Sequence, residues 1–262
     1  GVELTQAGQQ YYQSIKPYLI GLEQCTLDVI THKGLGGTLK LGVVPTFATR
    51  WLLPKLQRFN QIHPEITIHL ETSTKPFLFN ENIFDAAIYA GTQQQIDHWP
   101  GTQTHFLMTE DVVPVCSPQL IEKHFPDAKK INAHCYDLDA EQIIQLPLLQ
   151  QTTRLNIWQE WCEKHQIEHP QPFEGQRHEL FSMLAVAATH SMGMALIPQM
   201  LIKKELESSE LVIATNKTLT GVRSYYLVHS SQENSMLIEK FVDWIQLELK
   251  NEGLPYSFGT IE

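Results

Sequence analysis

Positive charge is scarce in this sequence of 262 residues. Lys and Arg number 19 against 29 Asp and Glu, which gives a formal net charge of −10 at pH 7. A protein that grips the phosphate backbone of a nucleic acid normally needs a basic face that displaces counterions. The acidic balance therefore argues against direct binding of nucleic acid by this chain.

Cysteines and long apolar runs are also few. The four cysteines, Cys25, Cys116, Cys135 and Cys162, include no C-x-x-C pair. Such spacing does not predict a disulfide framework and fits a reducing cytoplasm, with the thiols as small buried hydrophobic groups. No apolar run approaches the roughly 20 residues that span a bilayer. No signal peptide is recognised at the start of the chain either, so we predict no membrane partner.

Signatures of catalysis are missing as well. The sequence contains no G-x-S-x-G elbow, no H-E-x-x-H and no P-loop, and its carboxylates form no recognisable acid/base pair. Cys162, His165 and His169 have C-x2-H-x3-H spacing, but three ligands without a fourth are a weak zinc signal, and a solvated helix end is the simpler interpretation. We therefore predict no enzyme, no metal and no cofactor.

Residues 3–32 have the spacing of a helix that pairs with another helix. Two rows recur every seven positions: Leu4, Tyr11, Tyr18 and Cys25, then Gly8, Ile15, Leu22 and Val29. This a/d pattern over about four heptads indicates a dimerisation helix, although the seam could instead pack on the chain's own body. Thr5 is the predicted N-cap.

Pro17 complicates this helix, because an interior proline costs about 3 kcal/mol or forces a kink. We expect one kinked helix, and two shorter helices that meet at Pro17 are the alternative. Three glycines, Gly34, Gly36 and Gly37, then end the helix and begin a linker.

From Thr38 onward, predicted strands alternate with predicted helices. The strands are residues 39–43, 66–70, 84–91, 111–116, 194–197, 211–214 and 225–228, and helical stripes occupy 52–59, 180–187 and 238–249. This alternation predicts an α/β fold whose sheet is largely parallel.

The stretch from Val43 to Pro54 predicts a ligand pocket. A β-branched strand ends there, and a helix opens directly behind it. We expect Thr46 to cap that helix, with its hydroxyl facing a backbone N–H or a ligand. The unpaired N–H groups of a first helical turn favour an anion beyond the carboxyl end of the strand.

Several motifs together resemble the LysR-type transcriptional regulators. Leu4-Thr5-Gln6-Ala7-Gly8 is similar to the end of their winged helix-turn-helix wing, which leads into a long linker helix. The segment from Pro45 to Pro54 resembles the subgroup of glycine-cleavage activators and β-lactamase activators. Further similar motifs follow in the same order along nearly the whole chain: residues 85–88, 99–101, 114–118, 158–161, 193–196 and 225–228.

The resemblance implies an architecture. It comprises two α/β subdomains of the type 2 periplasmic-binding-protein kind, joined by two crossover strands and preceded by a long dimerisation helix. Residues 1–37 would hold the wing end and the linker helix. Residues 38–112 with 217–262 would form subdomain I, and 113–216 would form subdomain II.

The resemblance also implies a small-molecule effector in the cleft between the subdomains. The positions that would contact it are Thr46, Phe47, Asp85, Tyr89, Thr152, Thr153, Leu180 and Tyr225. The residues leave alternatives open. Thr46 could be a purely structural cap, and Asp85 could contact the backbone at a strand start. Phe47 and Tyr225 could be core aromatic rings, and Thr152 with Thr153 could belong to an ordinary surface loop. The family usually has an arginine where this chain has Tyr89, so effectors of relatives cannot be transferred.

The function implied is that of the effector-binding and oligomerisation region of a bacterial LysR-type regulator. Its expected partners are an effector (an amino acid, a small carboxylate or a cell-wall peptide), further copies in a homodimer or homotetramer, and promoter DNA bound through a preceding domain. The alternative is a solute-binding protein of the periplasmic type, which would lack the heptad helix.

Overall fold

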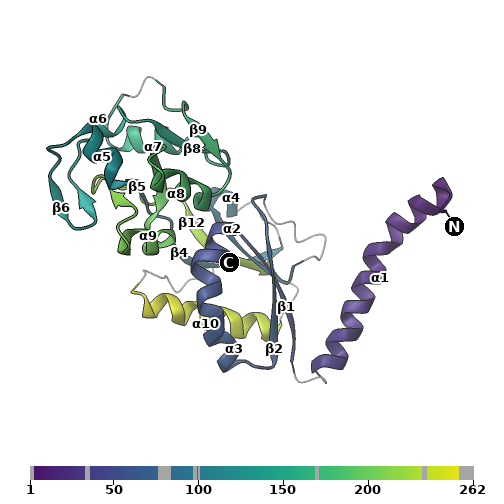
Figure 1. Cartoon of the computed structure of the whole chain (residues 1–262). Coiled ribbons are helices and arrows are strands. Elements are labelled where there is room, and N and C mark those ends of the chain that lie inside the picture. The colour runs from purple at the N-terminus through teal and green to yellow at the C-terminus, as the bar shows by residue number, and fades with distance from the viewer. Residues whose placement is uncertain are drawn as a thin grey trace.

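In the computed structural model the chain forms two lobes and a projecting N-terminal helix, α1 (Gln6–His32) (Figure 1). The structure describes residues 3–32, 36–75, 84–96, 99, 101–168, 171–231 and 235–253. Each lobe is built on its own β-sheet with helices packed against it. The predicted α/β fold with two subdomains is confirmed.

The first lobe carries a five-stranded sheet in the order β2-β1-β3-β12-β4. Its helices α3 and α10 pack together through three aromatic rings, those of Phe59, Phe241 and Trp244, with ring centroids 5.2–5.5 Å apart. The elements are β1 (Gly37–Val43), α2 (Pro45–Phe47), a π-helical turn η1 (Ala48–Leu52), α3 (Leu53–Ile62), β2 (Ile66–Thr72), β3 (Ala86–Gly91), α4 (Gln93–Ile96), β4 (Thr102–Thr109), β12 (Ser224–Ser230) and α10 (Met236–Asn251).

The second lobe carries a seven-stranded sheet in the order β6-β7-β11-β5-β10-β8-β9. Trp158 and Trp161 are buried in its core, where their indole N–H groups donate to the carbonyls of Leu149 (3.0 Å) and Lys217 (2.8 Å). The strands are β5 (Val112–Cys116), β6 (Lys130–Asn132), β7 (Cys135–Tyr136), β8 (Leu148–Gln151), β9 (Gln176–His178), β10 (Met194–Pro198) and β11 (Val212–Ile213). The helices are α5 (Pro118–His124), α6 (Ala140–Ile143), α7 (Ile157–Lys164), α8 (Phe181–Thr189), a 3-10 turn η3 (Gln199–Leu201) and α9 (Lys203–Glu207).

Both sheets are mixed rather than largely parallel, which corrects the sequence-based prediction. Strand β1 is parallel to β2 and β3, but β12 is antiparallel to both β3 and β4. In the second sheet β5 is antiparallel to β10 and β11. The reason is that β5 and β12 are reached by segments that cross between the lobes, and not by a helical crossover within one sheet.

The chain crosses between the lobes twice, between Thr109 and Val112 and between Ile213 and Ser224. The two crossing segments are hydrogen-bonded to each other: Val112 and Leu219 exchange backbone hydrogen bonds of 3.1 and 3.0 Å, and the Glu110 N–H donates to the Arg223 carbonyl at 2.9 Å. The predicted subdomain boundaries, at 112 and 217, stay a prediction; Val112 is the first residue of β5, and residue 217 lies in the second crossing segment. The crossings therefore form one paired connection between the lobes.

Helix α1 stands apart from both lobes (Figure 1). Its N-cap is Thr5, as predicted, because the Thr5 hydroxyl accepts a hydrogen bond of 3.2 Å from the Gly8 N–H. The helix continues through Pro17, so two separate helices are not formed. Tyr11 and Tyr18, on the predicted seam, are 67% and 79% exposed. The described part of the seam therefore does not pack on the chain's own body; Gly34 and the side chains of Cys25 and Val29 lie outside the described residues.

A pair of histidines, His105 half-buried and His229 buried, lies in the first sheet. His105 on β4 and His229 on β12 stack with ring centroids 5.3 Å apart, and their Nε2 atoms are 3.1 Å from each other. Burial, followed by the neighbouring His229, lowers the pKa of His105 to about 4. Nδ1 of His229 lies 3.0 Å from the Ser230 carbonyl, which can only accept, so Nδ1 of a neutral His229 carries its proton.

Three cysteines, Cys116, Cys135 and Cys162, are free and buried, as predicted. Burial raises the pKa of the Cys116 thiol to about 12. Of the predicted weak zinc motif, His165 lies against the Thr218 carbonyl (3.2 Å), and His169 is outside the described residues.

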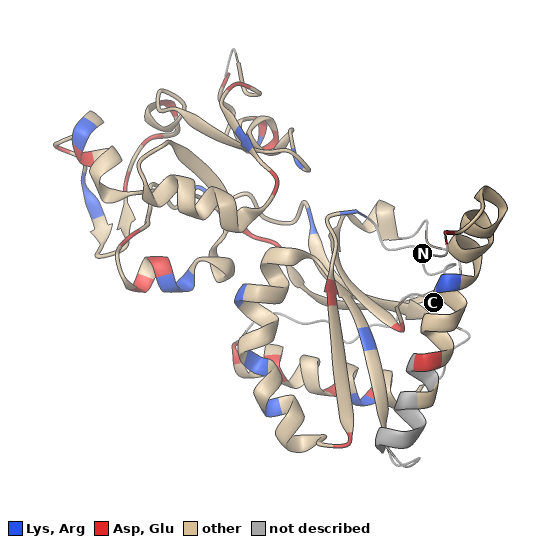
Figure 2. Cartoon of the chain, turned by 45° about the vertical axis from the view of Figure 1, so that its right-hand side comes forward, with Lys and Arg blue, Asp and Glu red and all other residues tan. Residues whose placement is uncertain are grey.

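Charged side chains are mixed over the described ribbon. Both signs of charge occur on both lobes, although the helical segment of residues 45–62 carries Arg50, Lys55 and Arg58 and no acidic residue (Figure 2). None of the helices in the described ranges combines the length and the apolar character that a membrane crossing requires.

Candidate functional site

The helical segment behind β1 positions the first site residues. Elements α2, η1 and α3 follow one another without a gap from Pro45 to Ile62. Its N-cap is Val44, which makes no side-chain capping bond, so the prediction that Thr46 caps the helix is wrong. Because the ring of Pro45 presets a helical φ and its nitrogen lacks a hydrogen, Pro45 takes the first helical position and Thr46 lies inside the helix.

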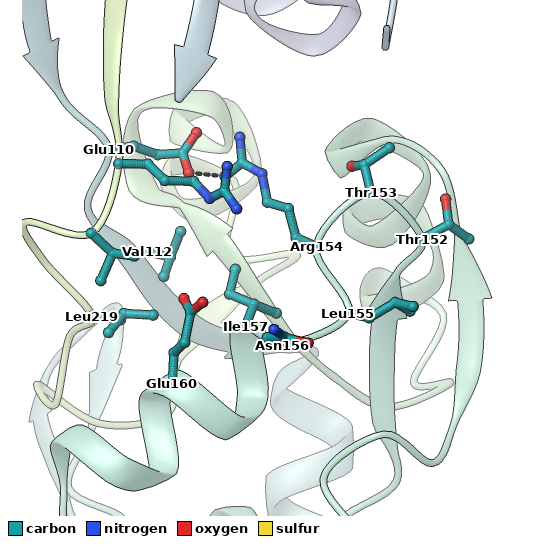
Figure 3. A pocket seen from close by; sticks show the side chains of 12 residues that line it. Glu110, Val112, Thr152, Thr153, Arg154, Leu155, Asn156, Ile157, Glu160 and Leu219 are labelled. Carbon is teal, nitrogen blue, oxygen red and sulfur yellow. Dashed lines mark ion pairs between the residues drawn. The ribbon is translucent and has the colours of Figure 1, made fainter. Parts of the chain in front are cut away.

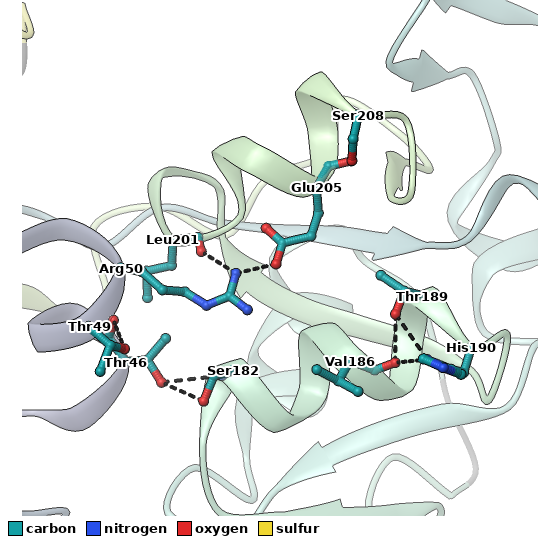
Figure 4. Close-up of polar contacts among 10 residues, drawn as sticks. All are labelled: Thr46, Thr49, Arg50, Ser182, Val186, Thr189, His190, Leu201, Glu205 and Ser208. Atoms are coloured by element: carbon teal, nitrogen blue, oxygen red, sulfur yellow. Dashed lines mark hydrogen bonds and ion pairs between the residues drawn. The ribbon is translucent and has the colours of Figure 1, made fainter. Parts of the chain in front are cut away.

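The Thr46 hydroxyl instead connects the two lobes. The Ser182 N–H, at the start of α8, donates to Thr46 Oγ1 at 3.2 Å, and the two hydroxyl oxygens are 3.5 Å apart (Figure 4). Thr46 is 5% exposed. The hydroxyl of Thr46 in the first lobe thus accepts a hydrogen bond from an N–H of the first turn of α8 in the second lobe.

Two further contacts connect the lobes beside Thr46. Arg50 extends from the π-helical turn, where its Nη1 donates to the Leu201 carbonyl at 3.0 Å and forms an ion pair with Glu205 (Figure 4). The Thr74 hydroxyl donates to Glu179 at 2.7 Å. Together these contacts hold the lobes face to face at the carboxyl end of β1.

A cavity of about 260 Å³ lies between the lobes at this point. It opens at the carboxyl ends of β1 and β3, and both lobes contribute to its wall. Six of the eight predicted effector contacts line it: Thr46, Phe47, Tyr89, Thr153, Leu180 and Tyr225. The remaining lining residues are Val44, Pro45, Thr74, Ala90, Gln151, Arg154, Glu179, Phe181, Leu201 and Arg223.

The other two predicted contacts lie elsewhere. Asp85 precedes β3 at the end opposite the cavity, and its carboxylate accepts a hydrogen bond of 2.7 Å from the Lys40 N–H. This is the backbone role that the sequence left open as an alternative. Thr152 is exposed and lines a neighbouring cavity of about 270 Å³ instead.

A stack of aromatic rings forms one wall. Phe47 is buried between Trp51 and Tyr225, with ring centroids 4.9 and 4.7 Å away. Burial raises the pKa of Tyr225 to about 12, against the opposing effect of the Arg154 cation. Phe47 and Tyr225 therefore belong to the core and to the cavity wall at once.

Two arginines that the sequence interpretation missed, Arg154 and Arg223, line the cavity. At the position where the family usually has an arginine, Tyr89 packs on Trp99 with ring centroids 5.2 Å apart. Arg154 and Arg223 supply cations from the second lobe and from a crossing segment. Arg154 directly follows the predicted Thr152–Thr153 loop, which is a usable signal, whereas no sequence pattern marks Arg223.

The Arg154 guanidinium forms an ion pair with Glu110 (Figure 3). It also lies over the Phe181 ring, 4.8 Å from the ring centroid. Its side chain is 11% exposed, and that of Glu110 is 2% exposed. Burial, partly offset by Tyr225, lowers the pKa of Arg154 to about 10, so the group remains a cation at neutral pH. The site thus offers hydroxyls, aromatic rings and fixed positive charge, the groups that orient a small polar solute.

The chain is similar in sequence to known proteins over most of its length. The Glycine cleavage system transcriptional activator of Escherichia coli K12 is 28% identical over 256 residues, which are 97% of this chain and 79% of that protein. The HTH-type transcriptional regulator DsdC of the same organism is 30% identical over 253 residues, 95% of this chain and 77% of that protein.

Solved structures show the same fold. The AmpR effector binding domain from Citrobacter freundii superposes with a TM-score of 0.69 at 24% identity, over 82% of this chain and 98% of that one. Full-length AphB of Vibrio cholerae gives a TM-score of 0.64 at 20% identity, over 93% and 79%. The model of the LysR substrate binding domain matches residues 32–250, and the chain therefore belongs to this family.

Proposed function

We propose that this chain is the effector-sensing and oligomerising part of a LysR-type transcriptional regulator. The observation that carries the proposal is the cavity of about 260 Å³, whose wall comes from both lobes. A solute held there contacts both lobes at once, so it stabilises one lobe arrangement over another. Such coupling typically amounts to about 1–3 kcal/mol.

The site residues have distinct roles in this proposal. Thr46, Thr153 and the arginines would hydrogen-bond the effector, and Phe47 with Tyr225 would form its apolar wall. Candidate effectors remain amino acids, small carboxylates and cell-wall peptides. Asp85 would support the β1–β3 pair instead of touching the ligand, because its carboxylate is occupied by the Lys40 N–H. Thr152 would border the neighbouring cavity.

Oligomerisation would use α1. Its exposed seam includes Leu4 (57%), Tyr11 (67%), Tyr18 (79%) and Leu22 (66%). A second α1 would cover this apolar row in a coiled coil.

Promoter DNA would be bound by a preceding domain, as the names of the HTH-type relatives suggest. The regulator would act in the cytoplasm. The periplasmic solute-binding alternative is disfavoured, because the relatives are named as transcriptional regulators.

The ligand part is tested with a thermal-shift screen of amino acids, small carboxylates and cell-wall peptides, followed by calorimetry on the hits. Thr46→Val should weaken binding of a true hit while the protein stays folded. Thr49→Val is the matched control, because Thr49 lies on the same helical segment, is exposed and is outside the cavity lining. Equal affinity of wild type and Thr46→Val would remove Thr46 from the site.

The assembly part is tested by light scattering. The wild type should form a dimer or tetramer, and Tyr11→Glu with Tyr18→Glu should shift it to monomers, because two carboxylates cannot be buried in an apolar seam. Gln13→Glu, an exposed change off the seam, should leave the assembly intact. A strictly monomeric wild type at tens of micromolar would contradict the proposal.

A further inference from the structure

A second cavity adjoins the cleft and shares part of its wall. This cavity of about 270 Å³ is bordered by the β8–α7 loop, the start of α7 and both crossing segments (Figure 3). Three residues line both cavities, namely Thr153, Arg154 and Arg223. The side chains of Arg154 and Arg223 therefore lie between the cleft and the two crossing segments.

The partner of Arg154 belongs to that connection. Glu110 lies between β4 and β5 on the first crossing segment, and its N–H donates to the Arg223 carbonyl on the second (2.9 Å). Its carboxylate forms the ion pair with Arg154. The Glu110 carboxylate thus attaches the first crossing segment to Arg154 in the cavity wall.

This ion pair is incompletely satisfied. Arg154 Nη1 is engaged by Glu110 Oε1, whereas Glu110 Oε2 is buried without a hydrogen-bond partner in the described structure, as is Oε1 of Gln151 in the cleft. Arg223, half-buried in the same wall, forms no ion pair with a described carboxylate. Glu110 therefore satisfies Arg154 with only one of its two oxygens, and Arg223 adds a second guanidinium to the same wall. An anion with enough acceptor oxygens for both guanidiniums would be stabilised between them.

Resting on the proposed function, we propose that the effector carries an oxyanion group that binds between Arg154 and Arg223 and replaces Glu110 as the partner of Arg154. A guanidinium matches the two oxygens of such a group in a bidentate geometry. Arg154 leaves Glu110 as it turns to the ligand, and the first crossing segment then loses its side-chain attachment to the second lobe, while its backbone bond to Arg223 remains. Binding of a charged ligand would in this way change the contacts of the crossing segments, and these segments set how the two lobes are arranged.

Isothermal titration calorimetry with inorganic sulfate tests the anion site without knowledge of the effector. Sulfate should bind the wild type, whereas sulfamide, a neutral molecule of similar shape, should not. Arg223→Gln should weaken sulfate binding about tenfold or more, because one charge-assisted contact is lost. Arg177→Gln is the matched control: Arg177 is exposed on β9 and lines neither cavity, so sulfate affinity should stay at the wild-type value.

The exchange itself is tested with Glu110→Gln. This change removes the competing carboxylate, so sulfate affinity should rise about tenfold over the wild type. If Glu110→Gln fails to fold, the Arg223→Gln comparison still decides the anion site. Equal binding of sulfate and sulfamide, or a Glu110→Gln affinity equal to that of the wild type, would overturn the inference. The proposed function would stand apart from that result, because the Thr46-dependent binding of a screening hit tests it independently.

Discussion

Acidification is expected to destabilise the first lobe through the His105–His229 pair. Because Nδ1 of neutral His229 is engaged with the Ser230 carbonyl, its Nε2 accepts the hydrogen bond that His105 Nε2 donates across 3.1 Å. Acid therefore places a positive charge on the half-buried ring of His105 next to the buried His229.

The size of the effect follows from the pKa of His105, which burial and His229 lower from 6.5 to about 4. The unfolded chain takes up a proton at this position below about pH 6.5, and the folded chain does so only near pH 4. Stability is thus fully present above pH 6.5 and is lost as the pH falls towards 4. The full value is about 3 kcal/mol, which solvent screening at this half-buried position reduces to about 1–2 kcal/mol.

Urea unfolding followed by tryptophan fluorescence, at about pH 7 and about pH 4.5, measures this loss. His105→Gln keeps a hydrogen-bond donor but does not titrate, so its free energy of unfolding should fall less than that of the wild type, by about 1–2 kcal/mol. His69→Gln, an exposed change on β2, should keep the wild-type pH dependence. Parallel pH profiles for the wild type and His105→Gln would refute the reasoning.

Three further predictions concern stability and use urea unfolding. Phe47→Ala should cost about 3–5 kcal/mol, because it leaves a hole between Trp51 and Tyr225; a loss under about 1 kcal/mol would contradict the aromatic wall. Trp161→Phe should cost about 1 kcal/mol through the lost bond to the Lys217 carbonyl, and no change would mean that this bond contributes nothing. Arg50→Gln should cost about 1–3 kcal/mol, against under about 0.5 kcal/mol for Lys203→Gln in an exposed pair; equal costs would show that Arg50 does not hold the lobes together.

Local patterns predicted the parts of the fold that local physics determines. The heptad rows and Thr5 predicted α1 and its start, alternation predicted β1, and a short apolar run closed by Pro198 predicted β10. The mixed sheets could not be read from the same patterns, because the direction of β5 and β12 depends on where the chain crosses between lobes. Strand β4, with its irregular register against β12, was also missed.

The candidate site shows the same division. Thr46, which follows β1, and Tyr89, near the end of β3, are predicted to lie together, and they do line one cavity. Hydrogen bonds between the lobes cannot be predicted from local sequence patterns, because their partners are far apart in the chain: Thr46 and Ser182 are 136 positions apart. The Thr46 cap failed as a prediction because Pro45 competes for the helix start and has the stronger backbone constraint.

The π-helical turn Ala48–Leu52 accommodates one residue more than a regular turn would. A single-residue deletion within it would restore an ordinary α-helix at little cost to the local backbone. The repaired helix would, however, rotate everything before it by about 100° relative to α3, so that Thr46 and Phe47 would face away from Ser182 and Tyr225. The π-helical turn therefore sets the rotation of the residues before it relative to α3. Because of this rotation, Thr46 and Phe47 face the cleft while Leu56 and Phe59 of α3 face the core.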